Sequence, residues 1–248
     1  MGFSACAESV QTKFYETTIG VLNNHQVTHI CSCKIWGKFG VALRSSERYR
    51  QAMPRFALKI EYDGQLFSGW QRQATAPSIQ QCVEESLAKL EPDLPSVAAA
   101  GRTDAGVHAL GQAVTLTTAC ELSPDVLLRA LNANTPGDLA VLDLQAARDG
   151  FNAIDDAIGK RYRYFIQDGP IPNVFMRHYA WQVRQALNVA AMHAAAQALR
   201  GTHDFKSYES SGSPRVSTVR SVSDLSVRRQ TWNETSYVVV EVEADGFL

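Results

Sequence analysis

The stretch RFALKIEYDG, residues 55–64, alternates apolar and polar side chains and ends in an Asp-Gly pair. Successive side chains of an extended strand point to opposite faces, so one face collects the apolar residues Phe56, Leu58, Ile60 and Tyr62. An Asp-Gly pair is typical of a tight turn. The stretch therefore predicts a half-buried strand that is ended by a turn.

The next periodic stretch, SIQQCVEESLAKLE at 78–91, has the period of a helix. Ser78 can cap its first turn, and Gln81 stands where the return partner of a capping box is found. One apolar stripe follows the helix at Ile79, Val83, Leu87 and Leu90.

The remaining patterns extend this alternation along the chain. Strands are predicted at 97–101, 111–118, 139–144, 160–167, 216–229 and 236–244, and helices at 123–134 and 188–200. The order β-α-β-β-α-β, then β-α-β-β, indicates an α+β fold of two ferredoxin-like (RRM-like) units, with mainly antiparallel sheets flanked by helices. We expect the first unit at 54–158, an incomplete second unit at 159–248, and a cleft between them.

Residues 1–53 lack a clear period. His25, His29, Cys31 and Cys33 fall close together and suggest a zinc site, although paired zinc cysteines are usually separated by two to four residues. We interpret residues 1–53 as a poorly ordered extension, or as upstream sequence translated from a misplaced start, with Met53 as the true start.

Composition limits the class of protein. The 248 residues carry a formal net charge of −1, so any surface that binds nucleic acid must be local. Five cysteines are sparse and odd in number, which favours reduced thiols in the cytoplasm over a disulfide scaffold. The sequence shows neither a secretory signal nor an apolar run of membrane-spanning length. We expect a globular cytoplasmic protein.

The segment GRTDAGVH, residues 101–108, carries the most chemical content. Two glycines bracket a tight loop after an apolar strand, and the loop presents Arg102, Asp104 and His108. A guanidinium beside a carboxylate favours the ionised acid, which can act as a nucleophile or a base. Two alternatives stay open: Asp104 simply caps the turn, or Asp104 and His108 bind a metal that lacks a clear third ligand.

Two further segments suggest contacts with RNA. In KRYRY, residues 160–164, three cations can hold phosphate while Tyr162 can stack on a base, although the tyrosines can equally belong to the core. In YDGQLFSGWQRQ, residues 62–73, Gln71 and Arg72 are available for RNA, and Trp70 is expected to anchor the loop.

These segments, in this order, resemble the bacterial tRNA pseudouridine synthase A family. The matching pieces are EYDG, GWQRQ, SIQ, AGRTDAGVHALGQ, LNANTPGDLAV, FNA, GKRYRY, GTHDFKSY and YVVVEVEADGF, between Arg55 and Leu248. The resemblance implies isomerisation of uridine to pseudouridine at positions 38 to 40 of the tRNA anticodon arm. It also implies a homodimer that binds tRNA across both subunits in a catalytic cleft, with no metal and no organic cofactor.

The resemblance also assigns roles to residues. It implies that Asp104 is the essential carboxylate, that Tyr162 contacts the target base and that Arg102 helps to expel the target nucleotide. The other residues expected to bind substrate are Arg161, Gln71, Arg72 and His108. The target has to be flipped out of the RNA stack. Asp104 then either adds covalently to the substrate or removes a ribose proton to form a glycal, and the sequence leaves both routes open.

The chain departs from the family pattern in three places. The family usually continues after the final Phe with a segment close to HxMVRxI, whose Arg pairs with the catalytic Asp, whereas this chain ends at ADGFL. The family often has FHAR where this chain has FNAI at 151–154. Residues 1–53 have no counterpart. The alternative function is therefore a catalytically impaired, truncated tRNA-binding remnant, and a third hypothesis gives residues 1–53 a metal-binding or protein-interaction role.

Overall fold

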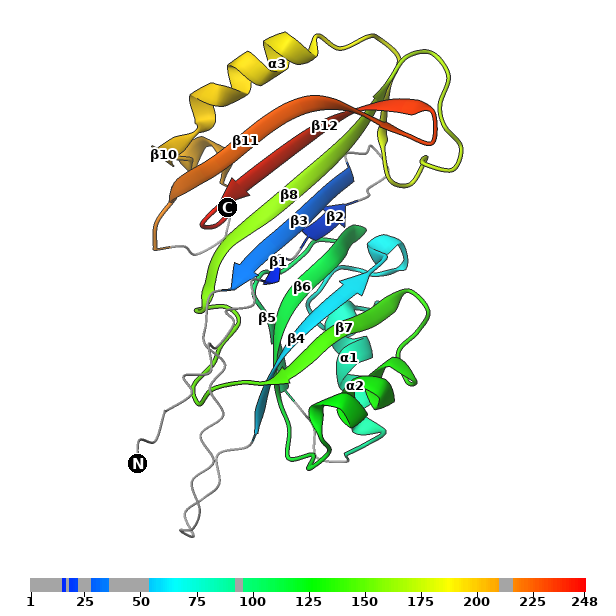
Figure 1. Cartoon of the computed structure of the whole chain (residues 1–248), viewed down its shortest axis with the longest axis vertical. Coiled ribbons are helices and arrows are strands. Elements are labelled where there is room, and N and C mark those ends of the chain that lie inside the picture. Colours follow the sequence, from blue (N-terminus) through cyan, green and yellow to red (C-terminus); the bar gives the residue numbers. More distant parts are fainter. Residues whose placement is uncertain (1–14, 17, 22–27, 36–53, 92–95, 210–215) are drawn as a thin grey trace, which may run out of the picture.

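The computed structural model describes residues 54–91, 96–209 and 216–248, together with the backbone of strands at 15–16, 18–21 and 28–35. Figure 1 shows two lobes, one built from β4–β7 with α1 and α2, and one built from β8–β12 with α3. The α+β class and the two ferredoxin-like units are confirmed. No helix in the described part of the chain is long and apolar enough to span a bilayer.

The first unit follows the predicted order. Its elements are β4 (Arg55–Tyr62), a 3₁₀ turn η1 (Gly64–Leu66), α1 (Ile79–Ala88), β5 (Ser96–Ala99), β6 (Val107–Thr117), α2 (Pro124–Asn132) and β7 (Leu139–Ala146). The strands pair antiparallel in the order β5-β6-β4-β7. β6 begins at Val107 rather than at residue 111, so the predicted 101–108 loop is shorter than expected.

The second unit has two strands that the sequence does not predict. Its elements are β8 (Ala157–Asp168), β9 (Trp181–Val183), α3 (Val189–Ala196), the 3₁₀ turns η2 (Gln197–Leu199) and η3 (Lys206–Tyr208), β10 (Gly201–Asp204), β11 (Val219–Trp232) and β12 (Thr235–Ala244). The order is β9-β8-β12-β11-β10, antiparallel except for the pair β8–β9. The unpredicted β9 and β10 are too short to show a period.

Two of the three strands before residue 54 join the sheets of the two units. β1 (Tyr15–Glu16) pairs with β3 (Thr28–Ile35), and both β3 and β2 (Thr18–Val21) pair with β6 and with β8, so that all twelve strands form one sheet. The sequence does not predict these strands, because neither face collects a consistent apolar set. The side chains of the suggested metal ligands His25, His29, Cys31 and Cys33, and the suggested start at Met53, lie outside the described residues.

Burial of apolar side chains explains the first unit. Ile79, Val83 and Leu87 are fully buried from the helix side, as the stripe on α1 predicts, and they join the apolar face of β4 in one core. Ser78 caps α1, with its Oγ accepting from the Gln81 N–H at 3.3 Å. The predicted return bond of the capping box, from the Gln81 side chain to the Ser78 backbone, is wrong, because the Gln81 side chain donates to Glu85 instead.

The second unit has smaller apolar clusters. Ile166, Val227 and Val238 form one, which partly buried residues of α3 such as Met192 cover. No residue of α3 is fully buried. The large core of the first unit therefore provides the firmer support for residues that project into the cleft between the units.

Candidate active site

The loop from Gly101 to Gly106 connects β5 to β6. Hydrogen bonds from neighbouring segments to its backbone hold it in place. The Trp70 N–H donates to the Thr103 carbonyl at 2.9 Å, and the Gly106 N–H donates to the Phe67 carbonyl at 3.2 Å. Gln112, which is fully buried, donates its side-chain amide to the Gly101 carbonyl. Trp70 is buried, as expected of an anchor. The segment after η1 thus supports both halves of the loop.

Gly69 allows the segment after η1 to approach the backbone of the Asp104 loop closely. Its φ is +98°, and a Cβ there would lie 2.4 Å from the Thr103 carbonyl oxygen. Any larger residue would therefore be strained and would also push against the backbone of the loop. The hydroxyl of Tyr62, at the end of β4, adds a hydrogen bond of 3.0 Å to the Thr103 Oγ1.

The loop forms one wall of a pocket of about 520 Å³ that lies between the two units. Arg102, Thr103 and Asp104 line it from the first unit. The second unit contributes aromatic rings and one guanidinium, from Tyr162, Tyr164, Phe205, Tyr208, Phe247 and Arg220. Tyr162 and Phe247 meet edge to face with ring centroids 4.6 Å apart. The structure therefore brings together Asp104, Arg102 and Tyr162, as the sequence predicts.

Charge inside the pocket is little compensated. The Asp104 side chain is exposed, and within the described residues its carboxylate accepts no hydrogen bond and forms no ion pair. Arg102 likewise has no acidic partner in that part of the chain. Arg220 donates Nη1 to the carbonyls of Ser217 and Val219, at 3.0 and 2.6 Å, and carries its charge into the same pocket.

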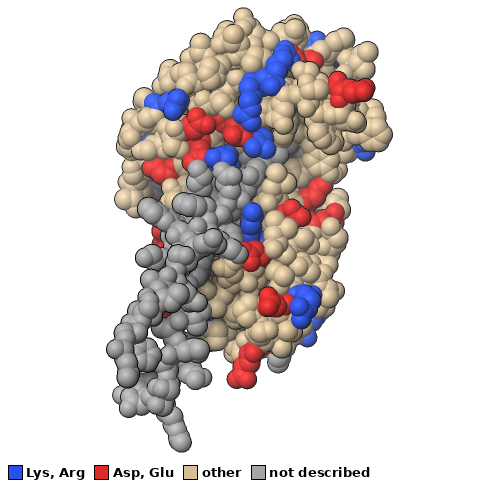
Figure 2. Space-filling model, in the orientation of Figure 1, with Lys and Arg blue, Asp and Glu red and all other residues tan. Residues whose placement is uncertain are grey.

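Positive charge elsewhere is neutralised or scattered. Arg161 donates to Glu243 from Nε at 3.0 Å and from Nη2 at 2.6 Å, and Arg163 pairs with Glu241. On the face shown in Figure 2, basic and acidic side chains are interspersed and large areas carry neither. The guanidinium groups of the pocket are thus a local feature, as the net charge of −1 requires.

The structure places four predicted site residues outside this pocket. Gln71 donates to Gln80 at 2.7 Å, and Arg72 donates to Glu84 at 2.8 Å, so both are held against α1. Arg161 is engaged with Glu243. His108 is buried and lines a separate pocket of about 640 Å³.

A metal site at Asp104 and His108 does not fit this geometry, because the two residues line different pockets. Among the described residues, no three His, Cys, Asp or Glu side chains come together as metal ligands.

The pocket also contains four residues that the sequence did not predict as part of the site: Arg220, Phe205, Tyr208 and Phe247. Phe205 and Tyr208 belong to GTHDFKSY, one of the segments that carry the family resemblance, so a signal for them was present. Arg220 had no signal beyond being one of many basic residues in the second unit. Its place in the pocket depends on how β11, β12 and β8 pair.

An exposed carboxylate, guanidinium groups without acidic partners and several aromatic rings, gathered between two RRM-like units, form a site of the kind that can bind a flipped RNA base. Comparison with known proteins identifies the family to which the chain belongs. The sequence model of one protein family, described as tRNA pseudouridine synthase, matches residues 59–153 and 195–248, which include the Asp104 loop, Phe205 and Arg220.

Three relatives carry the same description, tRNA pseudouridine synthase A. The chain is 39% identical over 197 residues to the protein of Jannaschia sp. strain CCS1, covering 79% of this chain and 76% of the relative. It is 36% identical to that of Thermoanaerobacter sp. strain X514, over 79% of each chain. It is 38% identical to that of Methylorubrum populi, over 79% of this chain and 78% of the relative. The chain therefore belongs to the tRNA pseudouridine synthase family.

Proposed function

We propose that this chain isomerises uridine to pseudouridine at positions 38 to 40 of the tRNA anticodon arm, with Asp104 as its catalytic carboxylate. Membership of the family makes it an isomerase that acts on tRNA. Beyond family membership, we propose that the target lies in the anticodon arm and that Asp104 is the reacting carboxylate. The observation that carries it is the uncompensated Asp104 carboxylate, which shares a pocket with Arg102 and Tyr162.

The reaction needs the parts that this pocket supplies. The N1–C1′ bond must break, uracil must turn, and C5 must bond to C1′, so the nucleotide has to leave the RNA stack. A volume of about 520 Å³ accommodates a nucleoside. Tyr162, backed by Phe247, can stack on the uracil while it turns. Asp104 either adds covalently to the substrate or removes a ribose proton to form a glycal.

The cations around the loop suit a flipped nucleotide. Arg102 and Arg220 enter the pocket from opposite units. Lys160 lies against the start of the loop, because a Cβ on Gly101 would be 3.2 Å from the Lys160 Nζ. Guanidinium and ammonium groups bind the phosphates on either side of a flipped base and so hold it in register.

We also propose an oligomeric state, a cellular location and domain boundaries for the chain. We propose a cytoplasmic homodimer whose units comprise residues 54–158 and 159–248 and which needs no small-molecule cofactor. Support for a dimer comes from large apolar side chains left exposed between β8 and β9, where Ile171, Val174 and Phe175 are 79%, 60% and 79% exposed. The two units have separate apolar cores, which supports the boundary between them.

A second candidate is a catalytically impaired tRNA-binding remnant. One observation favours it: in the described part of the chain, no side chain donates a hydrogen bond to the Asp104 carboxylate. A carboxylate without an orienting partner reacts less efficiently, whereas binding through arginines and aromatic rings would persist.

Mapping of pseudouridine in tRNA transcripts separates the candidates. The proposal predicts new pseudouridine at positions 38 to 40 after incubation with the full chain, and none after incubation with Asp104→Asn. Modification in another arm would refute the anticodon-arm assignment. Retention of tRNA by filter binding, with no pseudouridine anywhere, would support the remnant instead.

A further inference from the structure

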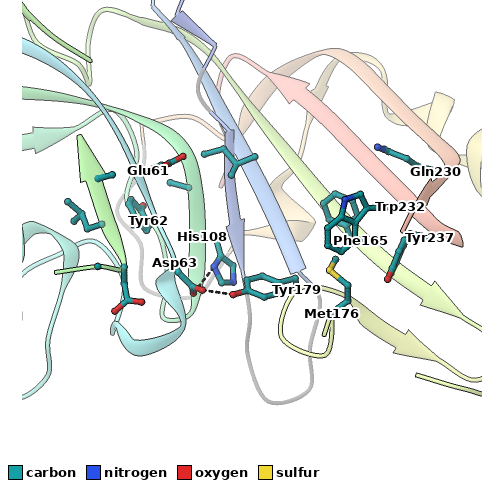
Figure 3. Close-up of a pocket in the computed structure, with 16 residues that line it drawn as sticks. Glu61, Tyr62, Asp63, His108, Phe165, Met176, Tyr179, Gln230, Trp232 and Tyr237 are labelled. Carbon is teal, nitrogen blue, oxygen red and sulfur yellow. Dashed lines mark hydrogen bonds and ion pairs between the residues drawn. The ribbon is translucent and has the colours of Figure 1, made fainter. Parts of the chain in front are cut away.

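Asp63 joins three segments that are distant in the sequence (Figure 3). It follows β4, and its Oδ1 accepts from the Gln65 N–H at 2.9 Å. Its Oδ2 accepts from the hydroxyl of Tyr179, in the second unit, at 2.6 Å. The Nδ1 of His108, on β6, lies 2.9 Å from the Asp63 Oδ1. One carboxylate thus connects β4, β6 and the connection between β8 and β9.

Protonation states follow from these contacts. The hydrogen bond to Asp63 raises the pKa of Tyr179 to about 12, so the hydroxyl keeps its proton and donates. Burial lowers the pKa of His108, despite the opposing effect of Asp63, so the ring is neutral near pH 7. Its Nδ1 lies 2.9 Å from the Asp63 Oδ1 and accepts a hydrogen bond of 3.2 Å from the Gly64 N–H, which ties the ring to the turn after Asp63.

The network reaches the back of the Asp104 loop. Val107 and His108 are neighbours at the start of β6, so they face opposite sides of the sheet. Val107 lines the Asp104 pocket, and His108 lines the pocket that holds the network. The turn after Asp63 packs directly on this point, since a Cβ on Gly64 would lie 1.9 Å from the Val107 carbonyl oxygen.

The second unit is attached at the same place. The rings of Tyr179 and His108 lie 5.1 Å apart between centroids, and Gln65 is within 3.3 Å of His178. The backbone of β6 therefore has the Asp104 pocket on one side and a hydrogen-bonded contact between the two units on the other.

We propose that Tyr179, Asp63 and His108 are positioning residues, which together set the Asp104 loop against the wall that the second unit builds around Tyr162. This inference rests on the proposed role of Asp104. The Asp104 side chain has no partner of its own in the described part of the chain, so the backbone of its loop determines where it lies. Reaction rates are sensitive to displacements of about 1 Å, so loss of one supporting contact should be measurable.

The first test uses hydrogen exchange and does not depend on activity. Tyr179→Phe removes only the hydroxyl that Asp63 accepts. Tyr237→Phe is the matched control: it removes a hydroxyl from a buried tyrosine of the same unit, one that lies 3.1 Å from Asn173 and does not touch Asp63. We expect Tyr179→Phe to speed amide exchange in residues 101–108 by about tenfold, the effect of one lost charge-assisted hydrogen bond. Unchanged protection there would overturn the inference.

The second test measures conversion of uridine under single-turnover conditions, together with the Kd for tRNA. Tyr179→Phe should slow conversion about tenfold while the Kd stays within about twofold, since the contact positions the loop and does not bind RNA. Tyr237→Phe should convert at the wild-type rate. A wild-type rate in Tyr179→Phe, with Asp104→Asn inactive, overturns this inference and leaves the proposed function intact. No conversion by the wild-type chain overturns the proposed function, and the exchange result then decides the positioning role alone.

Discussion

The ring of Tyr162 meets the ring of Phe247 edge to face, with centroids 4.6 Å apart, on the wall of the pocket opposite the Asp104 loop. Tyr162 also packs against the core of the first unit, although β8 belongs to the second. The side chain is therefore held from both units. A ring fixed in this way presents a flat surface to an incoming base at little further cost in side-chain entropy.

Stacking by Tyr162 predicts that the ring matters more than the hydroxyl. Tyr162→Phe should keep the single-turnover rate and the Kd for anticodon-arm RNA within a few-fold of wild type. Tyr162→Ala should weaken binding by about 1–3 kcal/mol, the value of one base stacked on an aromatic ring. Equal behaviour of the two variants in a fluorescence titration would contradict a stacking role.

The position of Gly69 predicts that even Gly69→Ala lowers the free energy of unfolding. In Gly69→Ala the new methyl would stand 2.4 Å from the Thr103 carbonyl oxygen, at a backbone φ of +98°. We expect the free energy of unfolding in urea to fall by about 1–3 kcal/mol. Gly137→Ala is the matched control, because nothing lies within 4 Å of its Cβ position. Equal stability of the two variants would argue against the close support of the loop.

The pair of Asp168 and Arg229 predicts an acid-dependent stability. Arg229 donates to both Asp168 oxygens, at 2.7 and 2.6 Å, and chiefly for this reason the pKa of Asp168 falls from 3.8 to about 2. The Asp168 side chain is only 4% exposed. Because the folded pKa lies below the unfolded one, its stabilisation is present above about pH 4 and is lost as the pH falls towards 2.

Asp168→Asn measures this effect. The variant should lose about 2 kcal/mol of unfolding free energy at neutral pH, and its deficit against wild type should shrink as the pH falls from about 4 to 2. Asp149→Asn is the control, since its side chain is exposed and without a partner in the described part of the chain. A deficit that does not change with pH would show that the ion pair is not its cause.

Arg220 predicts a change in salt dependence. Arg220→Gln should weaken RNA binding and reduce the slope of log Kd against log salt by about one, because one phosphate contact is lost. Arg72→Gln should change the slope little, since Arg72 is engaged with Glu84 outside the pocket. The reverse result, with only Arg72→Gln altering the slope, would place the RNA along α1 instead.

Local periodicity explains what the sequence could predict of the fold. The apolar stripe of α1 and the alternation in β4 are visible along the chain, and both lie where they were expected. β9 and β10, of three and four residues, exist because neighbouring strands pair with them. The four residues of β10 are all exposed, so no apolar pattern marks them.

In the candidate site, too, some residues could be predicted from local sequence and others could not. Arg102, Asp104 and Tyr162 stand in short motifs and could be named from the sequence. Arg161 could not be judged, because its charge is offset by Glu243, its partner across the pairing of β8 with β12. Cross-strand register is a tertiary property, and it determines which cations stay available to RNA.

Single-turnover conversion of uridine in an anticodon-arm RNA tests the central claim most directly, with Asp104→Asn set beside Asp149→Asn. The substitution at 104 changes the charge of an exposed side chain with little change in its volume, so folding and RNA affinity should be preserved. We predict that conversion disappears in Asp104→Asn and continues unchanged in Asp149→Asn. Conversion by Asp104→Asn at the wild-type rate would contradict the account, because the carboxylate of the pocket would then take no part in the reaction.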